Sequence, residues 1–137
     1  MAKIFLGSNE AFTVGANSTA DVYGLTGGTE KVIATAGAVV NADQNVERVE
    51  LSGAASSYTY AVAGNVVKVL SGTTVVASIG AGANAQTIAF SDGSAALALT
   101  GLNAATLGGQ SIPTTAGALT NVTLNKADVS SSATATA

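Results

Sequence analysis

The sequence predicts an all-β protein: a β-sandwich or a β-roll-like domain with an antiparallel meander over residues 58–100 and strand-like terminal arms. Short β-type runs recur along the chain and are separated by turns rich in glycine and asparagine. Proline occurs once, at Pro113, and the charge pairs that support helices are nearly absent. Two tight-turn signals, Gly64-Asn65 and residues 91–94, lie between matched apolar runs and predict hairpins.

The N-terminal residues 1–15 are expected to form an arm with two short strands, Lys3–Leu6 and Ala11–Val14, because both runs are of β type. Residues 16–112 are expected to form the main β domain. Residues 113–137 are expected to hold a C-terminal strand followed by a tail of small residues.

Between residues 17 and 53 the β-type segments are short and begin roughly 8 to 10 residues apart. This spacing is typical of the rungs of a β-roll or solenoid, and equally of short strands in a sandwich, so both architectures stay open. The segments are Ala20–Tyr23, Glu30–Ala34, Ala38–Val40 and Val46–Leu51.

Residues 58–70 predict the first hairpin of the meander. The two-residue loop Gly64-Asn65 fixes the register, so that Val62 faces Val67 and Tyr60 faces Val69. Side chains alternate between the two faces of a strand. One face should therefore carry the apolar core set, which is Tyr58, Tyr60, Val62, Val67 and Val69.

A second hairpin is predicted over residues 86–100. With Asp92-Gly93 as the loop, Phe90 faces Ala95 and Ile88 faces Leu97. Residues 75–79 read as a strand between the two hairpins, which completes a five-strand antiparallel meander.

Beyond the meander, residues 101–109 predict a turn or a short helical loop closed by the pair Gly108-Gly109. Ala118–Leu124 predicts a last strand, with Leu119, Val122 and Leu124 as its apolar positions. The small residues of Ser130–Ala137 have no reason of their own to be ordered.

The composition is that of a weakly charged, aromatic-poor chain. Hydrophobic residues make up 47% of the 137 residues, aromatic residues 4% and charged residues 9%, whereas charged residues are about 25% of an average domain. The core must therefore be built from alanine, valine, leucine and isoleucine. A surface with so few charges is poorly defended against association.

Several functions are disfavoured by what the chain lacks. It contains no histidine, cysteine or tryptophan, so zinc, iron–sulfur, thiol and histidine-base chemistry are excluded, and no enzyme is expected. The net charge is −3 and the five Lys and Arg residues are scattered, so no nucleic-acid surface is predicted. No apolar run approaches the about 18 residues of a membrane-spanning helix, so no membrane insertion is expected.

One polar cluster, around residues 43–50, offers candidate binding chemistry. Oxygen-bearing side chains on alternate positions of an extended segment project to one side, and Ca²⁺ takes about six to eight oxygen ligands. A solvated edge rich in turn-forming residues also explains the cluster, and both interpretations stay open. The candidate calcium ligands are Asp21, Glu30, Asp43, Asn45, Glu47 and Glu50.

Five local motifs occur together in this chain: Asn45–Gly53, Tyr58–Tyr60, Gly64-Asn65, Phe90–Ser94 and Leu107–Gly109. Together they resemble a module of large bacterial extracellular proteins of the repeats-in-toxin and surface-layer type, over roughly residues 20–112. The resemblance implies type I secretion with an uncleaved C-terminal signal, and calcium binding in many members. The chain departs from these proteins because it lacks their Gly-Gly-x-Gly-x-Asp nonapeptide, so their calcium ligands do not carry over.

The expected function is that of an extracellular structural protein, secreted or at the cell surface and without a cleaved N-terminal signal peptide. It would assemble with other copies of itself into a filament or lattice, as in a biofilm matrix or surface layer. The alternatives are a monomeric adhesion or carbohydrate-binding module, and a phage or virion decoration protein.

The expected mechanism is strand addition by a terminal arm, because edge strands normally carry lysine, proline or bulges against pairing and these arms have few such guards. The predicted self-association residues are Ile4, Phe5, Leu6, Leu119, Val122 and Leu124.

Overall fold

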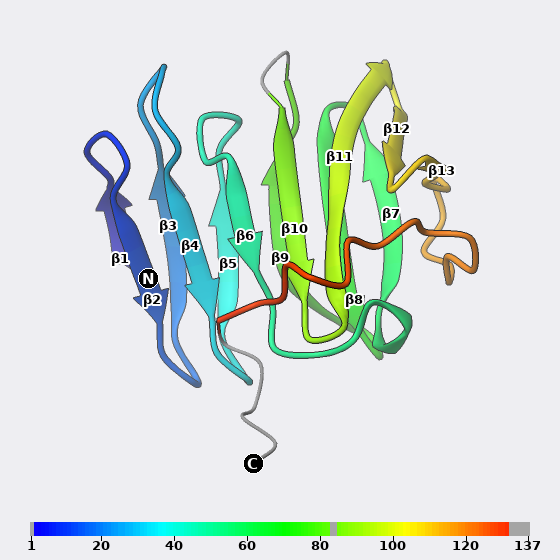
Figure 1. The fold of residues 1–137 in the computed structure, drawn as a ribbon, viewed down its shortest axis with the longest axis horizontal. Coiled ribbons are helices and arrows are strands. Elements are labelled where there is room, and N and C mark those ends of the chain that lie inside the picture. The colour runs from blue at the N-terminus through cyan, green and yellow to red at the C-terminus, as the bar shows by residue number, and fades with distance from the viewer. Residues whose placement is uncertain (1, 83–84, 132–137) are drawn as a thin grey trace.

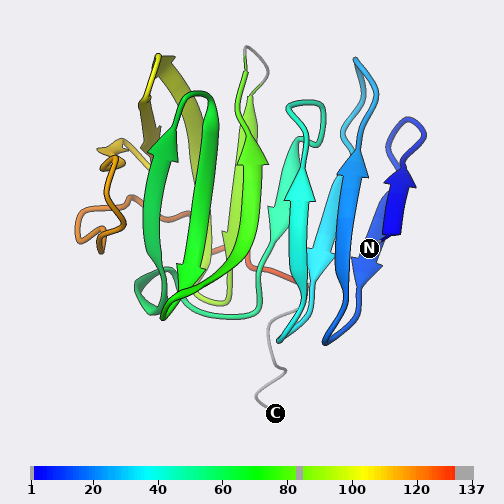
Figure 2. The same ribbon diagram turned by 180° about the vertical axis from the view of Figure 1, so that it is seen from behind.

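Two β-sheets packed face to face make up the computed structural model, which describes residues 2–82 and 85–131 (Figures 1 and 2). The all-β prediction is confirmed. The first sheet has six strands in the order β1-β3-β5-β9-β8-β7, and the second has seven in the order β13-β12-β11-β10-β6-β4-β2. A 3-10 turn, η1, spans Ala55–Ser57. The strands are β1 Ala2–Phe5, β2 Ala11–Val14, β3 Thr19–Tyr23, β4 Lys31–Ala34, β5 Val39–Ala42, β6 Arg48–Glu50, β7 Thr59–Ala63, β8 Val66–Ser71, β9 Thr74–Gly80, β10 Gln86–Phe90, β11 Gly93–Gly101, β12 Ala104–Leu107 and β13 Gln110–Ser111.

Strands β1 to β6, β9 and β10 wind as a roll. The pairs β1/β2, β3/β4, β5/β6 and β9/β10 are coils that each place one strand in each sheet, and strands of successive coils run parallel. The hairpin β7–β8 is inserted before the last of these coils, and β11 to β13 follow it with antiparallel pairing. The sandwich and the roll therefore describe the same molecule.

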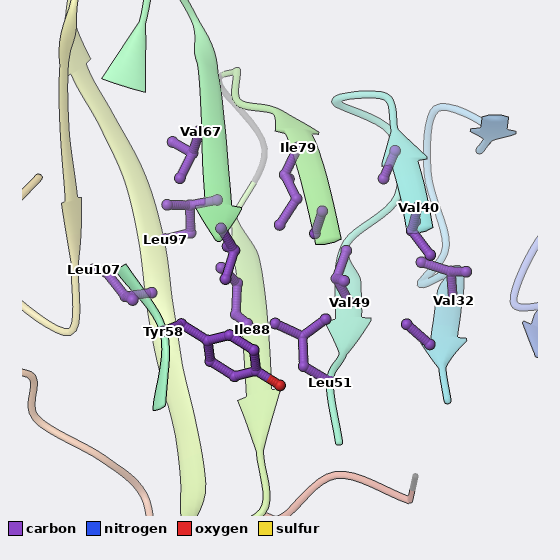
Figure 3. Close-up of a cluster of buried hydrophobic side chains, with 14 of the residues drawn as sticks. Val32, Val40, Val49, Leu51, Tyr58, Val67, Ile79, Ile88, Leu97 and Leu107 are labelled. Carbon is purple, nitrogen blue, oxygen red and sulfur yellow. The ribbon is translucent and has the colours of Figure 1, made fainter. Parts of the chain in front are cut away.

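The core lies between the sheets and is built from inward-facing residues at matching register positions (Figure 3). In the second sheet, for example, Val49 pairs with both Val32 and Ile88, and all three side chains are buried. One group of larger side chains sits among these small ones. Phe90 packs against Tyr58 and Tyr60 with ring centroids 6.0 and 6.4 Å apart.

The first hairpin has the predicted register, with Val62 opposite Val67 and Tyr60 opposite Val69. The antiparallel pairing predicted over residues 58–100 is present, but it is divided between the sheets. Strands β7, β8 and β9 belong to one sheet, and β10 and β11 to the other. The sequence gives no sign of this division, because the alternation of apolar residues is the same in both cases.

The second hairpin is shifted by two residues from the predicted register, because Phe90 lies opposite Gly93 and not opposite Ala95. The turn is therefore formed by residues 91–92. Gly93 has φ +149°, and a Cβ there would lie 2.9 Å from the carbonyl oxygen of Asn125. This glycine thus allows the close approach of the C-terminal segment. The even shift leaves the same residues facing the core.

Two predictions for the C-terminal third are wrong. Residues 101–109, expected as a turn or helical loop, contain β12, which pairs with β11. Residues 118–124, expected as a strand, contain none, and the nearest pairings are isolated bridges at Gly117 and Asn125. This segment instead runs over the surface of the domain.

The segment of residues 120–131, which we call the C-terminal strap, crosses the outer face of the second sheet (orange to red in Figure 1). The Thr123 N–H donates to the Gly108 carbonyl, and Asn125 exchanges backbone hydrogen bonds with Ser94. Farther along, the Ser130 N–H donates to the Phe90 carbonyl at 2.9 Å. The strap therefore ties strands at one end of the sheet to strands near its middle.

Candidate functional site

Three of the acidic residues form a stack at one end of the coils. Neighbouring strands of the second sheet pair in register at Ala11, Lys31, Arg48 and Thr87. The residue just before each of these therefore occupies the equivalent position at the start of its strand. These preceding residues are Glu10, Glu30, Glu47 and Gln86. Each coil of the roll thus enters the second sheet through a glutamate or a glutamine.

The stack binds backbone groups of neighbouring loops. The Glu30 carboxylate is fully buried and accepts the N–H groups of Leu25 at 2.8 Å and Asn9 at 3.1 Å. Glu47 accepts the N–H of Glu30 at 2.9 Å. Gln86 donates to the Gly80 carbonyl at 2.8 Å. The stack therefore links the end loops of successive coils.

The remaining candidate ligands of this end also have partners. The Asp43 carboxylate accepts the N–H groups of Gly24 and Asn45, both at 3.1 Å. Asp21 lies on the outer face of β3 and accepts the Asn41 amide at 2.8 Å. Over residues 2–82 and 85–131, the Asp and Glu residues form no group of three or more that could hold a metal ion.

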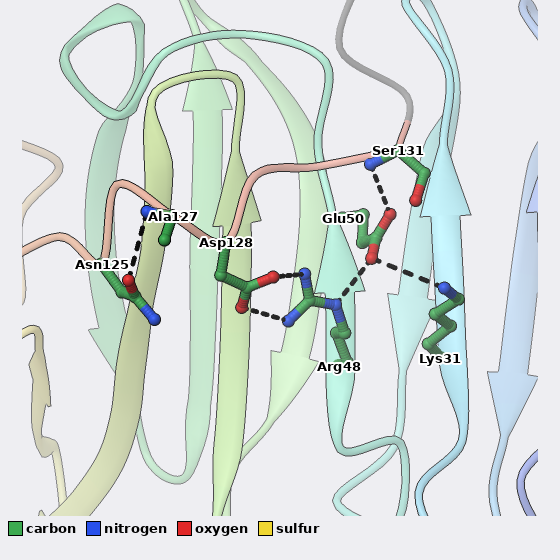
Figure 4. Close-up of polar contacts among 7 residues, drawn as sticks. All are labelled: Lys31, Arg48, Glu50, Asn125, Ala127, Asp128 and Ser131. Atoms are coloured by element: carbon green, nitrogen blue, oxygen red, sulfur yellow. Dashed lines mark hydrogen bonds and ion pairs between the residues drawn. The ribbon is translucent and has the colours of Figure 1, made fainter.

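Glu50, the last candidate ligand, lies apart from the stack, beneath the C-terminal strap (Figure 4). Its buried carboxylate accepts Arg48 Nε at 2.6 Å and the Ser131 N–H at 2.7 Å, and Lys31 Nζ is 3.8 Å away. Arg48 also binds Asp128 through two hydrogen bonds of 2.8 Å. One arginine thus joins a buried carboxylate of the sheet to a carboxylate of the strap.

This network shifts the pKa values of its members. Burial alone would raise the pKa of Glu50, but hydrogen bonds from Arg48 and Ser131 outweigh it and lower that pKa. The hydrogen bond from Arg48 lowers the pKa of Asp128. The same hydrogen bond to Asp128, with that to Glu50, raises the pKa of Arg48.

Acid should therefore weaken the domain through this network. Both carboxyl groups have lowered pKa values in the folded state, so their contribution is complete above the unfolded pKa of about 4 and is lost as the pH falls through the folded values. We expect the free energy of unfolding to rise with pH up to about 4.5 and then to level off. Urea unfolding between pH 3 and 7 measures this. In Asp128→Asn the rise should be smaller, and a curve parallel to that of the unmodified chain would contradict the assignment.

The predicted self-association residues fall into two sets. Leu119 is buried, and Val122 and Leu124 are partly buried against the core, so the C-terminal set is used within the chain. In the N-terminal set, Leu6 is buried and Ile4 partly buried. Phe5 is 74% exposed and stacks on Tyr23 with ring centroids 5.0 Å apart.

The two ends of the sandwich differ in how their edge strands are covered. At the β7 end, the Val62 N–H donates to the Pro113 carbonyl, and Tyr60 and Gly117 exchange backbone hydrogen bonds of 2.9 and 3.1 Å. At the opposite end, β1 and β2 are the outermost strands of their sheets, and no strand of the described residues pairs with their outer sides (Figures 1 and 2). We call this end the open edge.

Alternation along the strands shows which backbone groups the open edge presents. The Leu6 N–H donates to Tyr23 of β3, so in β1 the backbone groups of Ile4 also point to β3, and those of Lys3 and Phe5 point outward. In β2 the carbonyls of Glu10 and Val14 face β4, so the backbone groups of Ala11 and Thr13 point outward.

No family model, no curated protein and no solved structure matches this chain. The described residues contain no helix long and apolar enough to cross a membrane. The sequence interpretation missed Glu10 and Gln86 as members of the stack and Asp128 as the partner of Arg48. Gln86 and the glutamates could have been found only from the register, because the four positions are spaced unevenly along the chain.

Proposed function

We propose that this chain is a structural module of an extracellular assembly, a filament or lattice such as a biofilm matrix or surface layer, whose copies associate through the open edge. The observation that carries this proposal is the pair of unprotected edge strands. Strands β1 and β2 contain one charged residue, Lys3, and no proline or bulge, which are the usual guards against pairing.

The surroundings of the open edge favour association by pairing over exchange of an arm. Leu119, Val122 and Leu124 pack against the chain's own core, so freeing them would expose apolar surface. The open edge needs no such rearrangement, because its outward backbone groups are already in an extended conformation. The low charge of the surface, 9% of residues, reduces repulsion between copies.

Light scattering after gel filtration, together with negative-stain microscopy, tests the proposal. We expect the mean mass to increase with protein concentration, and ordered assemblies at high concentration. A mass that stays at 13.2 kDa up to millimolar protein would overturn the proposal.

The same samples test calcium as a stabilising ion. The candidate ligands accept hydrogen bonds from the chain, so we expect assembly and melting temperature to be the same with calcium and with chelator. Assembly that needs calcium would instead support an ion site.

A second candidate is a carbohydrate-binding module. The outer face of β3 and β5 carries a shallow hollow lined by Asp21, Tyr23, Asn41 and Asp43, beside the exposed ring of Phe5. Aromatic rings next to polar side chains are typical of ligand sites. A monomer that is retained on a polysaccharide column, and loses retention in Tyr23→Ala, would favour this function.

A further inference from the structure

We infer that the open edge pairs with the same edge of a second copy about a two-fold axis perpendicular to the sheets. Strand β1 would run antiparallel to β1 of the other copy, with Ile4 opposite Ile4 and Lys3 opposite Phe5. This inference rests on the proposed function and names the partner, the surface and the register.

The choice of a second copy as the partner of the open edge follows from the difference between the two ends of the sandwich. Strand β7 is covered by residues 113–117, which hydrogen-bond to the backbone N–H and carbonyl of Tyr60 and to the N–H of Val62. The other edge strand at that end, β13, has only two residues, so within the described residues the open edge presents the longest unpaired edge strands, and a second open edge is the partner that matches both of them. Pairing of identical surfaces is isologous and closes at two copies, so the dimer would be the unit from which a larger assembly is built through other surfaces.

The register follows from the direction of the backbone groups and side chains. In antiparallel pairing, residues that exchange hydrogen bonds must both point their backbone groups at the partner, which in β1 means Lys3 and Phe5. Ile4 then lies opposite an even-numbered residue. This arrangement also keeps the half-buried Ile4 on the inner side of both copies, so that the two cores become continuous.

Among the registers that satisfy this rule, the charge of Lys3 and the availability of backbone N–H donors favour the one that places Lys3 opposite Phe5. Pairing Lys3 with Lys3 would place like charges opposite one another. Pairing Phe5 with Phe5 would bring Lys3 opposite Gly7, whose N–H already donates to the Glu10 carboxylate. Pairing Lys3 with Phe5 uses free backbone groups throughout and places an ammonium group beside an exposed aromatic ring.

Strand β2 can pair in the same way. Its outward backbone groups belong to Ala11 and Thr13, and its side chains carry no charge. Phe12, which is only partly buried against the core of one copy, would be covered by the second. Both sheets would then continue across the dimer.

Disulfide trapping tests the register, because the chain contains no cysteine of its own. Ile4 opposite Ile4 is a non-hydrogen-bonded pair with Cα atoms about 4.5 Å apart, which lies within the about 4.4–6.8 Å range of disulfides. We expect Ile4→Cys to form a covalent dimer under mild oxidation. The control Leu102→Cys, 83% exposed in the turn between β11 and β12, should form far less.

A pair of variants at Phe5 tests the edge itself. The Phe5 N–H points outward, so Phe5→Pro removes a donor of the open edge and leaves the β1–β3 hydrogen bonds of Ile4 and Leu6 in place. Phe5→Ala removes the same ring but keeps the donor. We expect Phe5→Pro to raise the dimer dissociation constant at least about tenfold above that of Phe5→Ala, or about 1.4 kcal/mol, at equal melting temperature.

The outcomes separate this inference from the proposed function. Equal dissociation constants for the two Phe5 variants, or equal trapping at positions 4 and 102, would overturn the two-fold pairing while self-association stands. An unmodified chain that stays monomeric would overturn the proposed function and the pairing with it.

Discussion

Replacing Glu30 with alanine is expected to lower the free energy of unfolding by about 2–3 kcal/mol, because two backbone N–H groups lose their acceptor. The side chain is fully buried and accepts hydrogen bonds from Asn9 and Leu25, which belong to the end loops of two successive coils. This loss of stability lies in the lower part of the range for buried unpaired groups, because Asn9 and Leu25 are exposed residues and water can partly replace the lost acceptor. Urea unfolding followed by circular dichroism measures the change.

Glu10→Ala is the matched control for this prediction. Glu10 occupies the equivalent position in the first coil, but it is exposed and accepts the N–H of Gly7 in its own loop. Its replacement should cost about 0.5 kcal/mol or less. Equal losses for the two variants would mean that the stack does not link the coils.

Replacing Phe90 with alanine is expected to cost about 4 kcal/mol, the largest effect of any single truncation proposed for this chain. Phe90 is fully buried at the meeting point of Tyr58 and Tyr60, in a core whose other side chains are mostly valine and alanine. Small neighbours with few rotamers cannot collapse into the space that a lost ring leaves. The same denaturant titration reports the loss.

Phe5→Ala provides the control, because it is the same chemical change at a ring that is 74% exposed. It should alter the free energy of unfolding by less than about 1 kcal/mol at protein concentrations where the chain is monomeric. If Phe90→Ala were equally mild, the aromatic group would not be the centre of the core.

The sequence interpretation succeeded where local chemistry determines the structure. The two-residue turn at Gly64 fixes the pairing of Tyr60 with Val69, and the alternation of apolar residues identifies which face of β7 and β8 is buried. These signals operate within a few residues of each other. They require no knowledge of the rest of the fold.

Pairing between coils could not be predicted in the same way. Glu30 follows Glu10 by 20 positions and Glu47 follows Glu30 by 17, so no turn geometry sets their register. Their alignment arises only when the coils stack. For this reason the sequence grouped six candidate calcium ligands that the fold separates: Glu30 and Glu47 come together, whereas Asp21 and Glu50 lie on the outer faces of different sheets.

The C-terminal segment was misassigned for a related reason. The segment has the apolar spacing of a strand, at Leu119, Val122 and Leu124. It instead approaches the sheet as irregular chain, because Gly93 and Gly108 have no side chains to keep it away. A Cβ at Gly108 would lie 2.7 Å from the Thr123 carbonyl oxygen. Such long-range use of glycine leaves no local trace in the sequence.

The long-range contacts of the strap have a mechanical consequence. Its contacts join residues about 80 positions apart, with Ser131 held by Glu50 and Asp128 held by Arg48. A pulling force applied at the C-terminal end would act on these contacts one at a time, starting with Ser131. Each contact would therefore break at a lower force than the whole set would if it were loaded together. The strap would thus detach and extend before the pulling force reaches the hydrogen bonds between the coils.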